Sequence, residues 1–260
     1  MRIVSLTCSN TEIVWALGVA SALVGVDDHS DFPEDVVGRL PRVGPDLDID
    51  VERVAALAPD LVLASLTVPG HERIVERLAH ARLPFVATEP VSVADVYADI
   101  ARIGDLLGVT DRASVVISEM RGELDVPPSN SGPSVLVEWW PKPVIVPGRL
   151  SWVTDMIGAA GGRNPLGDEL VKSRPITDDE ARAIDPDAVV ISWCGVKPEK
   201  YRPDIVRRRA AWQCMRAVEQ GRIYCVPEAY LGRPGPRLSH GVRALREIVG
   251  DCRQVSVQRT

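Results

Sequence analysis

The sequence lacks the cysteine spacing that would define a disulfide framework or a zinc site. Its five cysteines are an odd number without a Cys-x-x-Cys pair, a pattern typical of reduced thiols in a cytoplasm. They are Cys8, Cys194, Cys214, Cys225 and Cys252. The four histidines show no His-x-x-x-His or His-Glu-x-x-His spacing, so no metal site built by the protein is expected.

The sequence also lacks a basic excess and any long apolar run. Its net charge of −6 argues against a nucleic-acid partner, which requires a basic face. No apolar run approaches the roughly 20 residues of a membrane span, so membrane insertion is not expected. Residues 2–6 already have the pattern of a strand, and no signal-peptide features precede them. We expect a cytoplasmic location for the chain as it stands, and an extracytoplasmic one if an export signal preceded it.

A recognisable catalytic set is missing as well. There is no Gly-x-Ser-x-Gly motif, phosphate-binding loop or paired-carboxylate arrangement. GAAGG at 158–162 follows an expected helix instead of linking a strand to one, which excludes a dinucleotide-binding loop. Cys8 with His29 as its base is the one nucleophile pair to consider, and a plain wall thiol is the favoured alternative. We therefore expect a binding protein and not an enzyme.

What the sequence does contain is a repeated phrase, APDLVLAS at 58–65 and DPDAVVIS at 185–192. Each copy follows a helical pattern, has a proline that stops the helix, and continues as a short apolar run typical of a buried parallel strand. Further strands and helices are expected at 2–6, 11–18, 83–88, 134–139, 151–162 and 222–227. This alternation predicts two α/β lobes with parallel sheets. One continuous doubly wound sheet is the alternative.

A helical stretch is expected to join the two lobes. Val96, Ile100 and Ile103 recur at helical spacing, and Gly108 separates this helix from a second one. PPSNSGPS at 127–134 then breaks the regularity. The expected domains are an N-terminal α/β lobe at 1–108, a connecting helix and linker at 109–133, and a C-terminal α/β lobe at 134–260.

Aromatic residues are concentrated in the second half. Two α/β lobes create a cleft, and ligands lie outside the carboxyl ends of parallel strands. Five rings fall in loops expected there: Trp139, Trp140, Trp193, Tyr201 and Tyr230. Burying one ring face against a ligand contributes on the order of 1.5–3 kcal/mol. Three others, Trp15, Trp152 and Trp212, lie within helical patterns and are expected in the core.

Polar residues are expected at the same edge. Ser9-Asn10-Thr11-Glu12 has the pattern of a capping box directly after a strand. Its helix N-terminus either is simply capped or favours an anion or amide oxygen of a ligand. His29 and His71 lie in loops of the expected cleft, where either can reach a ligand or its metal.

At this point the residues resemble a known family. The opening stretch RIVSLTCSNTEIVWALGVASALVGVDDHSDFP is similar to that of cobalamin-binding proteins of the helical-backbone, class III periplasmic-binding-protein-like superfamily, closest to members without a signal peptide. PRVG, APDLVLAS, EWWPKP, GAAGG and AYLGRPGPRL resemble later parts of the same pattern. The resemblance implies two Rossmann-like lobes with parallel sheets, joined by a single long helix, with the ligand cleft between them.

The resemblance also implies a ligand and its contacts. Cobalamin or a related corrinoid is expected as ligand, with no catalytic cofactor. Aromatic residues would pack on the macrocycle, polar residues would meet its amide periphery or tail, and arginines would pair with its phosphate. The expected ligand-binding residues are Ser9, Asp28, His29, Phe32, Leu66, Glu138, Trp139, Trp140, Trp193, Tyr230, Arg233 and Arg237.

A permease of the ABC-importer type is the expected protein partner. Exported members of the superfamily dock through one glutamate per lobe, and the corresponding positions here are Glu72 and Glu180. Acidic residues in a first helical turn are also ordinary helix-dipole partners. Two alternative functions remain: a ferric siderophore or haem binding protein, with Arg149, Arg233 and Arg237 as a cationic clamp, and a cytoplasmic corrinoid-processing enzyme or chaperone.

Overall fold

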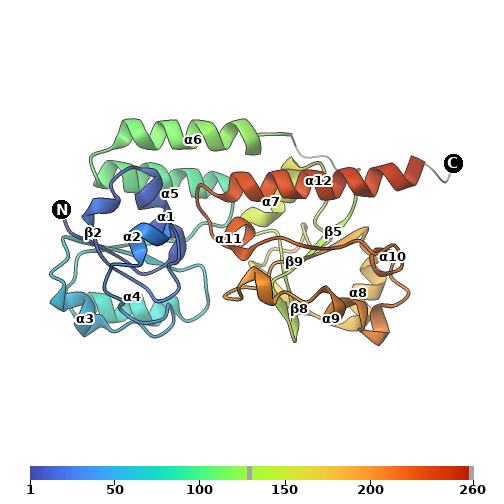
Figure 1. Cartoon of the computed structure of the whole chain (residues 1–260), viewed down its shortest axis with the longest axis horizontal. Helices are drawn as coiled ribbons and strands as arrows, with labels where there is room; N and C mark the ends of the chain where they lie inside the picture. The colour runs from blue at the N-terminus through green and yellow to red at the C-terminus, as the bar shows by residue number, and fades with distance from the viewer. Residues whose placement is uncertain (128–130, 258–260) are drawn as a thin grey trace. The chain divides into compact units, whose positions relative to one another are not determined.

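The computed structural model describes residues 1–127 and 131–257; residues 128–130 of the expected linker lie outside the described residues. The chain divides into two compact units (Figure 1). Unit 1 comprises Met1–Pro90 and Ala94–Glu119, and unit 2 comprises Val91–Val93 and Met120–Thr260. The lobe boundaries expected at residues 108 and 134 stay predictions.

Unit 1 is built on a four-stranded, wholly parallel sheet in the order β2-β1-β3-β4. All five residues of β3 are buried, as its continuous apolar sequence requires. The strands are β1 Ile3–Ser5, β2 Leu23–Val26, β3 Leu61–Ser65 and β4 Phe85–Thr88. The helices are α1 Cys8–Ala16, α2 Glu34–Val37, α3 Val51–Ala56, α4 His71–His80, α5 Val93–Leu106 and α6 Thr110–Leu124, with a 3-10 turn at Ala20–Ala22. The last residues of α6 belong to unit 2.

Unit 2 has a parallel three-stranded sheet in the order β10-β9-β5 and a second, antiparallel sheet in the order β6-β7-β8. Its strands are β5 Val135–Glu138, β6 Trp140–Pro141, β7 Val144–Pro147, β8 Ser173–Ile176, β9 Ala188–Ile191 and β10 Ile223–Cys225. Its helices are α7 Trp152–Ala159, α8 Asp178–Ile184, α9 Pro203–Arg207, α10 Arg216–Glu219, α11 Glu228–Leu231 and α12 Leu238–Val257, with 3-10 turns at Pro198–Lys200 and Ala210–Trp212. The predicted α/β class with parallel sheets is confirmed.

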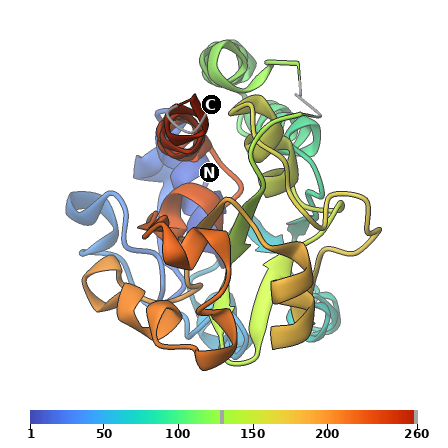
Figure 2. The same cartoon turned by 90° about the vertical axis from the view of Figure 1, so that its right-hand side faces the viewer.

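Helices cover both faces of the parallel sheet in unit 2. Leu136, Val189 and Ile191 pack in one apolar cluster with Ala181 of α8, whereas α12 packs against α7 and α11. Because successive strand residues point to opposite faces, the two helix groups lie on opposite sides, as Figure 2 shows. Trp152 and Trp212, expected in the core, are both buried.

The antiparallel sheet is a feature that the sequence analysis missed. The EWWPKP stretch was expected to be a loop, but Trp140–Pro141 pairs with Val144–Ile145 as a hairpin. Prolines at 141, 143 and 147 interrupt the apolar alternation, and proline normally weakens a strand assignment. The hairpin fixes the position of the two adjacent tryptophans.

Two local expectations in unit 1 are wrong. The first helix begins at Cys8 with Thr7 as N-cap, so Ser9 lies inside the helix and makes no capping bond. The capping box that does form is Thr177–Glu180 at α8. Trp15 is 41 % exposed instead of lying in the core, and its ring packs edge-on against Phe32 of the 27–33 loop.

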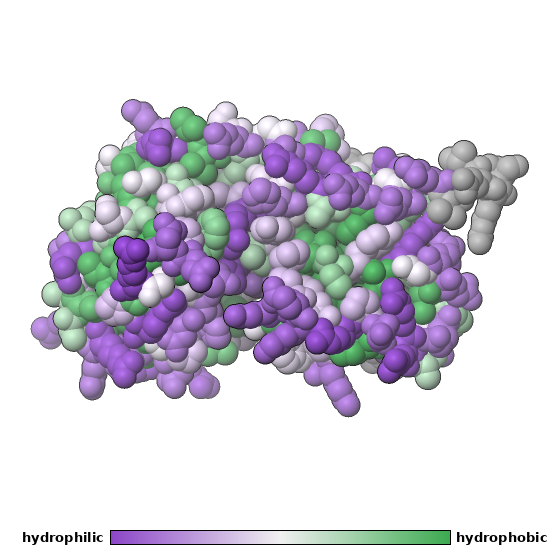
Figure 3. Space-filling view, in the orientation of Figure 1, coloured by the Kyte–Doolittle hydropathy of each residue, from purple (hydrophilic) through white to green (hydrophobic). Residues whose placement is uncertain are grey.

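The surface is of mixed polarity. On the face shown in Figure 3, hydrophilic residues are interspersed with small hydrophobic patches. Within residues 1–127 and 131–257, no helix combines the length and the apolar character needed to cross a membrane.

Gly241 tests the packing of α12. A Cβ at this position would lie 2.1 Å from the carbonyl oxygen of Tyr230 and 2.7 Å from the Met156 side chain. We expect Gly241→Ala to lower the free energy of unfolding by about 1–3 kcal/mol, because backbone must move to relieve the overlap. Urea denaturation followed by circular dichroism measures the change.

Gly250→Ala is the matched control on the same helix. A Cβ there meets no atom of the described residues within 4 Å, and alanine is the better helix former by up to about 1 kcal/mol. The control should therefore be neutral or stabilising. Equal effects of the two substitutions would contradict the packing described for α12.

Candidate functional site

In unit 1, a buried polar network lies where β1 and β2 end. The Thr11 hydroxyl donates to Ser5 Oγ at 2.9 Å and lies 2.8 Å from Ser30 Oγ. Ser30 in turn donates to Asp27, whose other carboxylate oxygen accepts the N–H of His29 at 2.9 Å. Burial raises the pKa of Asp27, and these hydrogen bonds oppose that rise. The network holds the 27–33 loop on the sheet edge.

Asp28 and His29 project from this loop and are exposed. Asp28 pairs with the main chain of Gly44: its N–H donates to the Gly44 carbonyl at 2.9 Å, and its carboxylate accepts the Gly44 N–H at 3.3 Å. Gly44 has φ +104° and its Cα faces the Asp48 carbonyl, so glycine is required there. The 27–33 loop and the 44–49 loop are therefore locked together.

Asp46 lies between two histidines. His29 Nε2 is 3.7 Å from one carboxylate oxygen, and His71 Nε2 is 3.6 Å from the other. His71, the first residue of α4, is only 3 % exposed, and neither of its ring nitrogens has a hydrogen-bond partner among the described residues. The adjacent His71 ring lowers the pKa of Asp46, burial opposes this, and charge on His29 adds to the lowering.

The His71 ring borders a small cavity of about 10 Å³. Its other walls come from the carboxyl ends of β1 and β3, from the 44–49 loop and from α4: Leu6, Thr7, Asp46, Ala64, Ser65 and Ile74. The Ser65 hydroxyl is 2.9 Å from that of Thr67, which orders the 66–70 turn. The cavity thus combines a buried imidazole with a carboxylate at the ends of parallel strands.

The remaining predicted residues of unit 1 lie around the same edge. Ser9 is buried, with its hydroxyl 3.3 Å from Thr7 Oγ1. Phe32 is half-buried, and its ring centroid is 4.9 Å from that of Trp15. Leu66 is half-buried directly after β3. Exposed Leu47 and Val68 lie on the neighbouring loops.

In unit 2, Glu138 at the end of β5 is completely buried. Arg209 donates to both of its carboxylate oxygens, at 2.6 and 2.9 Å, and to the Pro141 carbonyl at 3.2 Å. The indole N–H of Trp193 donates to the same carboxylate at 2.9 Å. Glu138 and Trp193, expected to face a ligand, are therefore bonded to each other inside the unit. The arginine that neutralises Glu138 was not recognised in the sequence, where it is one of three consecutive arginines.

The two tryptophans after β5 differ in exposure. Trp140 is 42 % exposed, whereas Trp139 is half-buried with its ring centroid 6.2 Å from that of Trp152. The indole N–H of Trp139 has no hydrogen-bond partner among the described residues. Tyr201, another expected loop ring, is buried edge-on against Trp193.

The tail loop of unit 2 has a second aromatic and basic group. The Tyr230 ring centroid lies 5.2 Å from that of His240, and the Arg237 guanidinium is 5.7 Å from the Tyr230 ring. Arg233 donates to Glu228 at 3.0 Å. Tyr230 and Arg237 thus form a joint surface, while Arg233 is committed to an ion pair.

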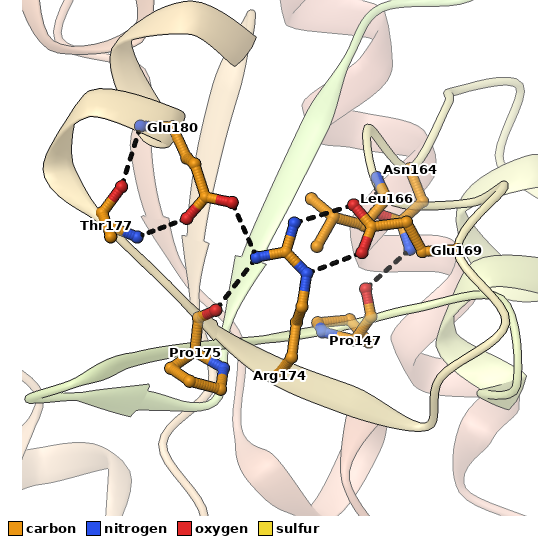
Figure 4. Close-up of polar contacts among 8 residues, drawn as sticks. All are labelled: Pro147, Asn164, Leu166, Glu169, Arg174, Pro175, Thr177 and Glu180. Carbon is orange, nitrogen blue, oxygen red and sulfur yellow. Dashed lines mark hydrogen bonds and ion pairs between the residues drawn. The ribbon is translucent and has the colours of Figure 1, made fainter.

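The two glutamates expected to dock a permease have different surroundings. The Glu72 carboxylate accepts the N–H of Gly70 at 2.8 Å at the start of α4. Glu180 is bonded to Arg174 at 3.0 Å, and Arg174 also donates twice to Glu169, as Figure 4 shows. The Arg174 guanidinium lowers the pKa of Glu169.

Among the described residues, no group of three or more His, Cys, Asp or Glu side chains is arranged to hold a metal ion.

The sheets and loops described above define a class of protein: α/β units whose parallel sheets end in polar and aromatic loops suited to binding a small molecule. The family model described as "Periplasmic binding protein" matches residues 3–230. The chain belongs to this family, and it is a substrate-binding protein of the ABC-transporter type.

Similar proteins support this assignment. The chain is 30 % identical over 258 residues to the uncharacterized ABC transporter substrate-binding lipoprotein YvrC of Bacillus subtilis (strain 168), covering 95 % of this chain and 79 % of that one. It is 24 % identical to the vitamin B12-binding protein of Pectobacterium carotovorum subsp. carotovorum (strain PC1), covering 91 % and 84 %. A solved structure, the periplasmic heme-binding protein RhuT from Roseiflexus sp. RS-1, is 26 % identical with a TM-score of 0.81, covering 96 % and 98 %.

The buried ion pair of unit 2 has a measurable energetic consequence. Glu138→Gln leaves the Arg209 guanidinium without its counter-charge, so we expect the free energy of unfolding to fall by about 3–5 kcal/mol. Asp204→Asn is the control, because it breaks an exposed pair with Arg207 and should cost less than about 1 kcal/mol. Equal losses in urea denaturation would mean that Glu138 is not neutralised as described.

The Asp46–His71 contact predicts a pH dependence. Because the folded-state pKa of Asp46 is lowered, the contact stabilises the fold above the unfolded value of about 4 and is lost as pH falls through the folded value. We expect His71→Asn to raise the pKa of Asp46 and to destabilise the protein at about pH 6 but not at about pH 3.

Carboxyl-carbon NMR titration measures the Asp46 pKa, and urea denaturation at the two pH values measures stability. His80→Asn, at the exposed end of the same helix, is the control and should leave Asp46 unchanged. An Asp46 titration that is the same in wild type and His71→Asn would show that the two side chains do not interact.

Proposed function

We propose that the protein binds cobalamin or a related corrinoid and presents it to a permease of an ABC importer. The observation that supports this most is the set of aromatic rings in the segments that follow β5 and β10 of unit 2: exposed Trp140 and half-buried Trp139 and Tyr230. Flat rings of this kind suit a large, flat macrocycle. The Pectobacterium relative, matched over 91 % of this chain, is named a vitamin B12-binding protein.

Unit 1 supplies the polar contacts in this proposal. Asp28 and His29 are exposed on the locked 27–33 loop and meet the amide periphery of the corrinoid. Phe32 and Leu66 contribute apolar contacts beside them. Ser9 is buried and contributes through the N-terminal turn of α1.

In unit 2, the buried residues have a supporting part. Glu138 is bonded to both Trp193 and Arg209, and Arg209 also donates to the Pro141 carbonyl of the β6–β7 hairpin. Arg237 pairs with a phosphate of the ligand. Arg233 joins it only if it leaves Glu228.

Glu72 and Glu180 are the proposed permease contacts. In the folded chain Glu180 is already paired with Arg174, so a basic partner has to compete with Arg174 for it. The B. subtilis relative is named a lipoprotein, and we propose that this protein likewise acts outside the cytoplasmic membrane.

Haem is the second candidate ligand, because the RhuT structure that this chain resembles at 26 % identity is named heme-binding. A ferric siderophore is less well supported. Of the arginines expected as its clamp, Arg149 pairs with Asp155 at 3.2 Å and Arg233 with Glu228 at 3.0 Å.

Retention of coloured ligands tests the proposal. The protein is incubated separately with cyanocobalamin, haemin and a ferric siderophore, desalted, and examined for the absorption that co-elutes. We expect cyanocobalamin to be retained unchanged. Trp140→Ala should weaken its binding at least about tenfold, because a ring contact contributes about 1.5–3 kcal/mol.

Leu170→Ala is the matched control, since Leu170 is an exposed apolar residue of unit 2, 76 % exposed, away from the aromatic loops in sequence. It should bind as wild type does. Retention of haemin alone would replace cobalamin by the second candidate, and chemical conversion of the retained corrinoid would favour an enzyme. Unaltered affinity in both Trp139→Ala and Trp140→Ala would remove the aromatic rings from the proposal.

A further inference from the structure

We propose that the cavity bordered by Asp46 and His71 binds an uncharged carboxamide arm of the ligand, and so selects amide-bearing over acid-bearing macrocycles. This inference rests on the proposed function, because it names a chemical group of the same ligand. It assigns ligand selectivity to Asp46 and His71 of unit 1, which take no part in the aromatic contacts proposed for unit 2.

The first argument is that the cavity is bordered by a buried polar side chain whose ring nitrogens make no hydrogen bond in the described structure. His71 is 3 % exposed, and neither ring nitrogen has a hydrogen-bond partner within residues 1–127 and 131–257. A buried polar group without a partner costs about 1–3 kcal/mol. A neutral imidazole has one N–H donor and one acceptor nitrogen, so a ligand group entering the cavity regains this loss.

The second argument is the pairing of a donor with an acceptor. Asp46 Oδ2 lies 3.6 Å from His71 Nε2, too far for an ordinary hydrogen bond but close enough for both to reach one small group. A primary carboxamide has the matching pair: its NH₂ donates to the carboxylate, and its oxygen accepts from the imidazole. The cavity of about 10 Å³ is about the size of one water molecule, so a ligand arm reaches it with its terminal polar atoms only and no ring enters.

The third argument is charge. The Asp46 side chain is 32 % exposed, and its pKa is lowered, so it is ionised at neutral pH. A carboxylate arm would place a second negative charge beside it, and like charges in contact cost several kcal/mol. His29 lies 3.7 Å from the other oxygen of Asp46 and is not among the residues that line the cavity.

The position of the cavity fits a ligand arm. Its walls include Thr7 and Ser65, which follow or end the central strands β1 and β3. Exposed Leu47 and Val68 belong to the two loops beside it. When a ligand arm enters the cavity, the body of the ligand lies beside the apolar side chains of Leu47 and Val68.

Two corrinoids that differ only in their arms and tail test the inference. Dicyanocobinamide has carboxamide arms, and dicyanocobyrinic acid has carboxylate arms on the same ring. We expect wild type to bind the amide form at least about tenfold more tightly. Asp46→Asn should reduce this ratio severalfold or more, because it removes the negative charge. Titration calorimetry measures both affinities.

Asp48→Asn is the matched control, with the same charge change in the same loop at an exposed position, and it should keep the wild-type ratio. His71→Gln retains an N–H donor and should keep amide binding better than His71→Leu, which provides a second test if Asp46→Asn does not fold. Equal ratios in wild type, Asp46→Asn and Asp48→Asn would overturn the inference alone. Failure of wild type to bind either corrinoid would overturn the proposed function and the inference with it.

Discussion

One fully buried interior strand in the parallel sheet of each unit is the constraint on which the other features depend. β3 and β9 are buried along their whole length and are paired on both sides. Parallel neighbours bring their carboxyl ends to one edge, so the loops after them gather there. Asp27, Asp46 and His71 come together in unit 1 for this reason, and Glu138 meets Trp193 in unit 2 because β5 and β9 end side by side.

The same strands explain how much of the fold was predictable. Each has a short apolar run after a helix-stopping proline, and that local signal predicts β3 and β9 and the helices α3 and α8 before them. The apolar runs at 2–6, 83–88, 134–139 and 222–227, alternating with helical patterns, complete the prediction of the α/β class. The β6–β7 hairpin was missed because its prolines obscure strand alternation. The start of α1 was misplaced because the Ser9–Glu12 pattern fits a capping box equally well, whereas in the structure those side chains turn inward.

Sequence could place some residues of the candidate site on particular segments, but not the contacts that they make. Sequence placed Asp28 and His29 on a loop at the strand ends, and they are exposed there, whereas Trp140 is exposed on the β6 strand instead of on a loop. It could not foresee that Glu138 is neutralised by Arg209, which is distant in sequence and adjacent to other arginines. Nor could it pair Asp46 with His71, because 25 residues and a whole strand separate them. Such pairs are decided by tertiary packing, which no local pattern encodes.

The unequal distribution of tryptophan between the units has an optical consequence. Five of the six indoles belong to unit 2, and only Trp15 belongs to unit 1. Ultraviolet emission of the whole protein therefore reports mainly on unit 2, from rings as different as fully buried Trp212 and solvent-facing Trp140. Removal of the other five by substitution would leave a single fluorophore beside Phe32, with which unit 1 could be watched by itself.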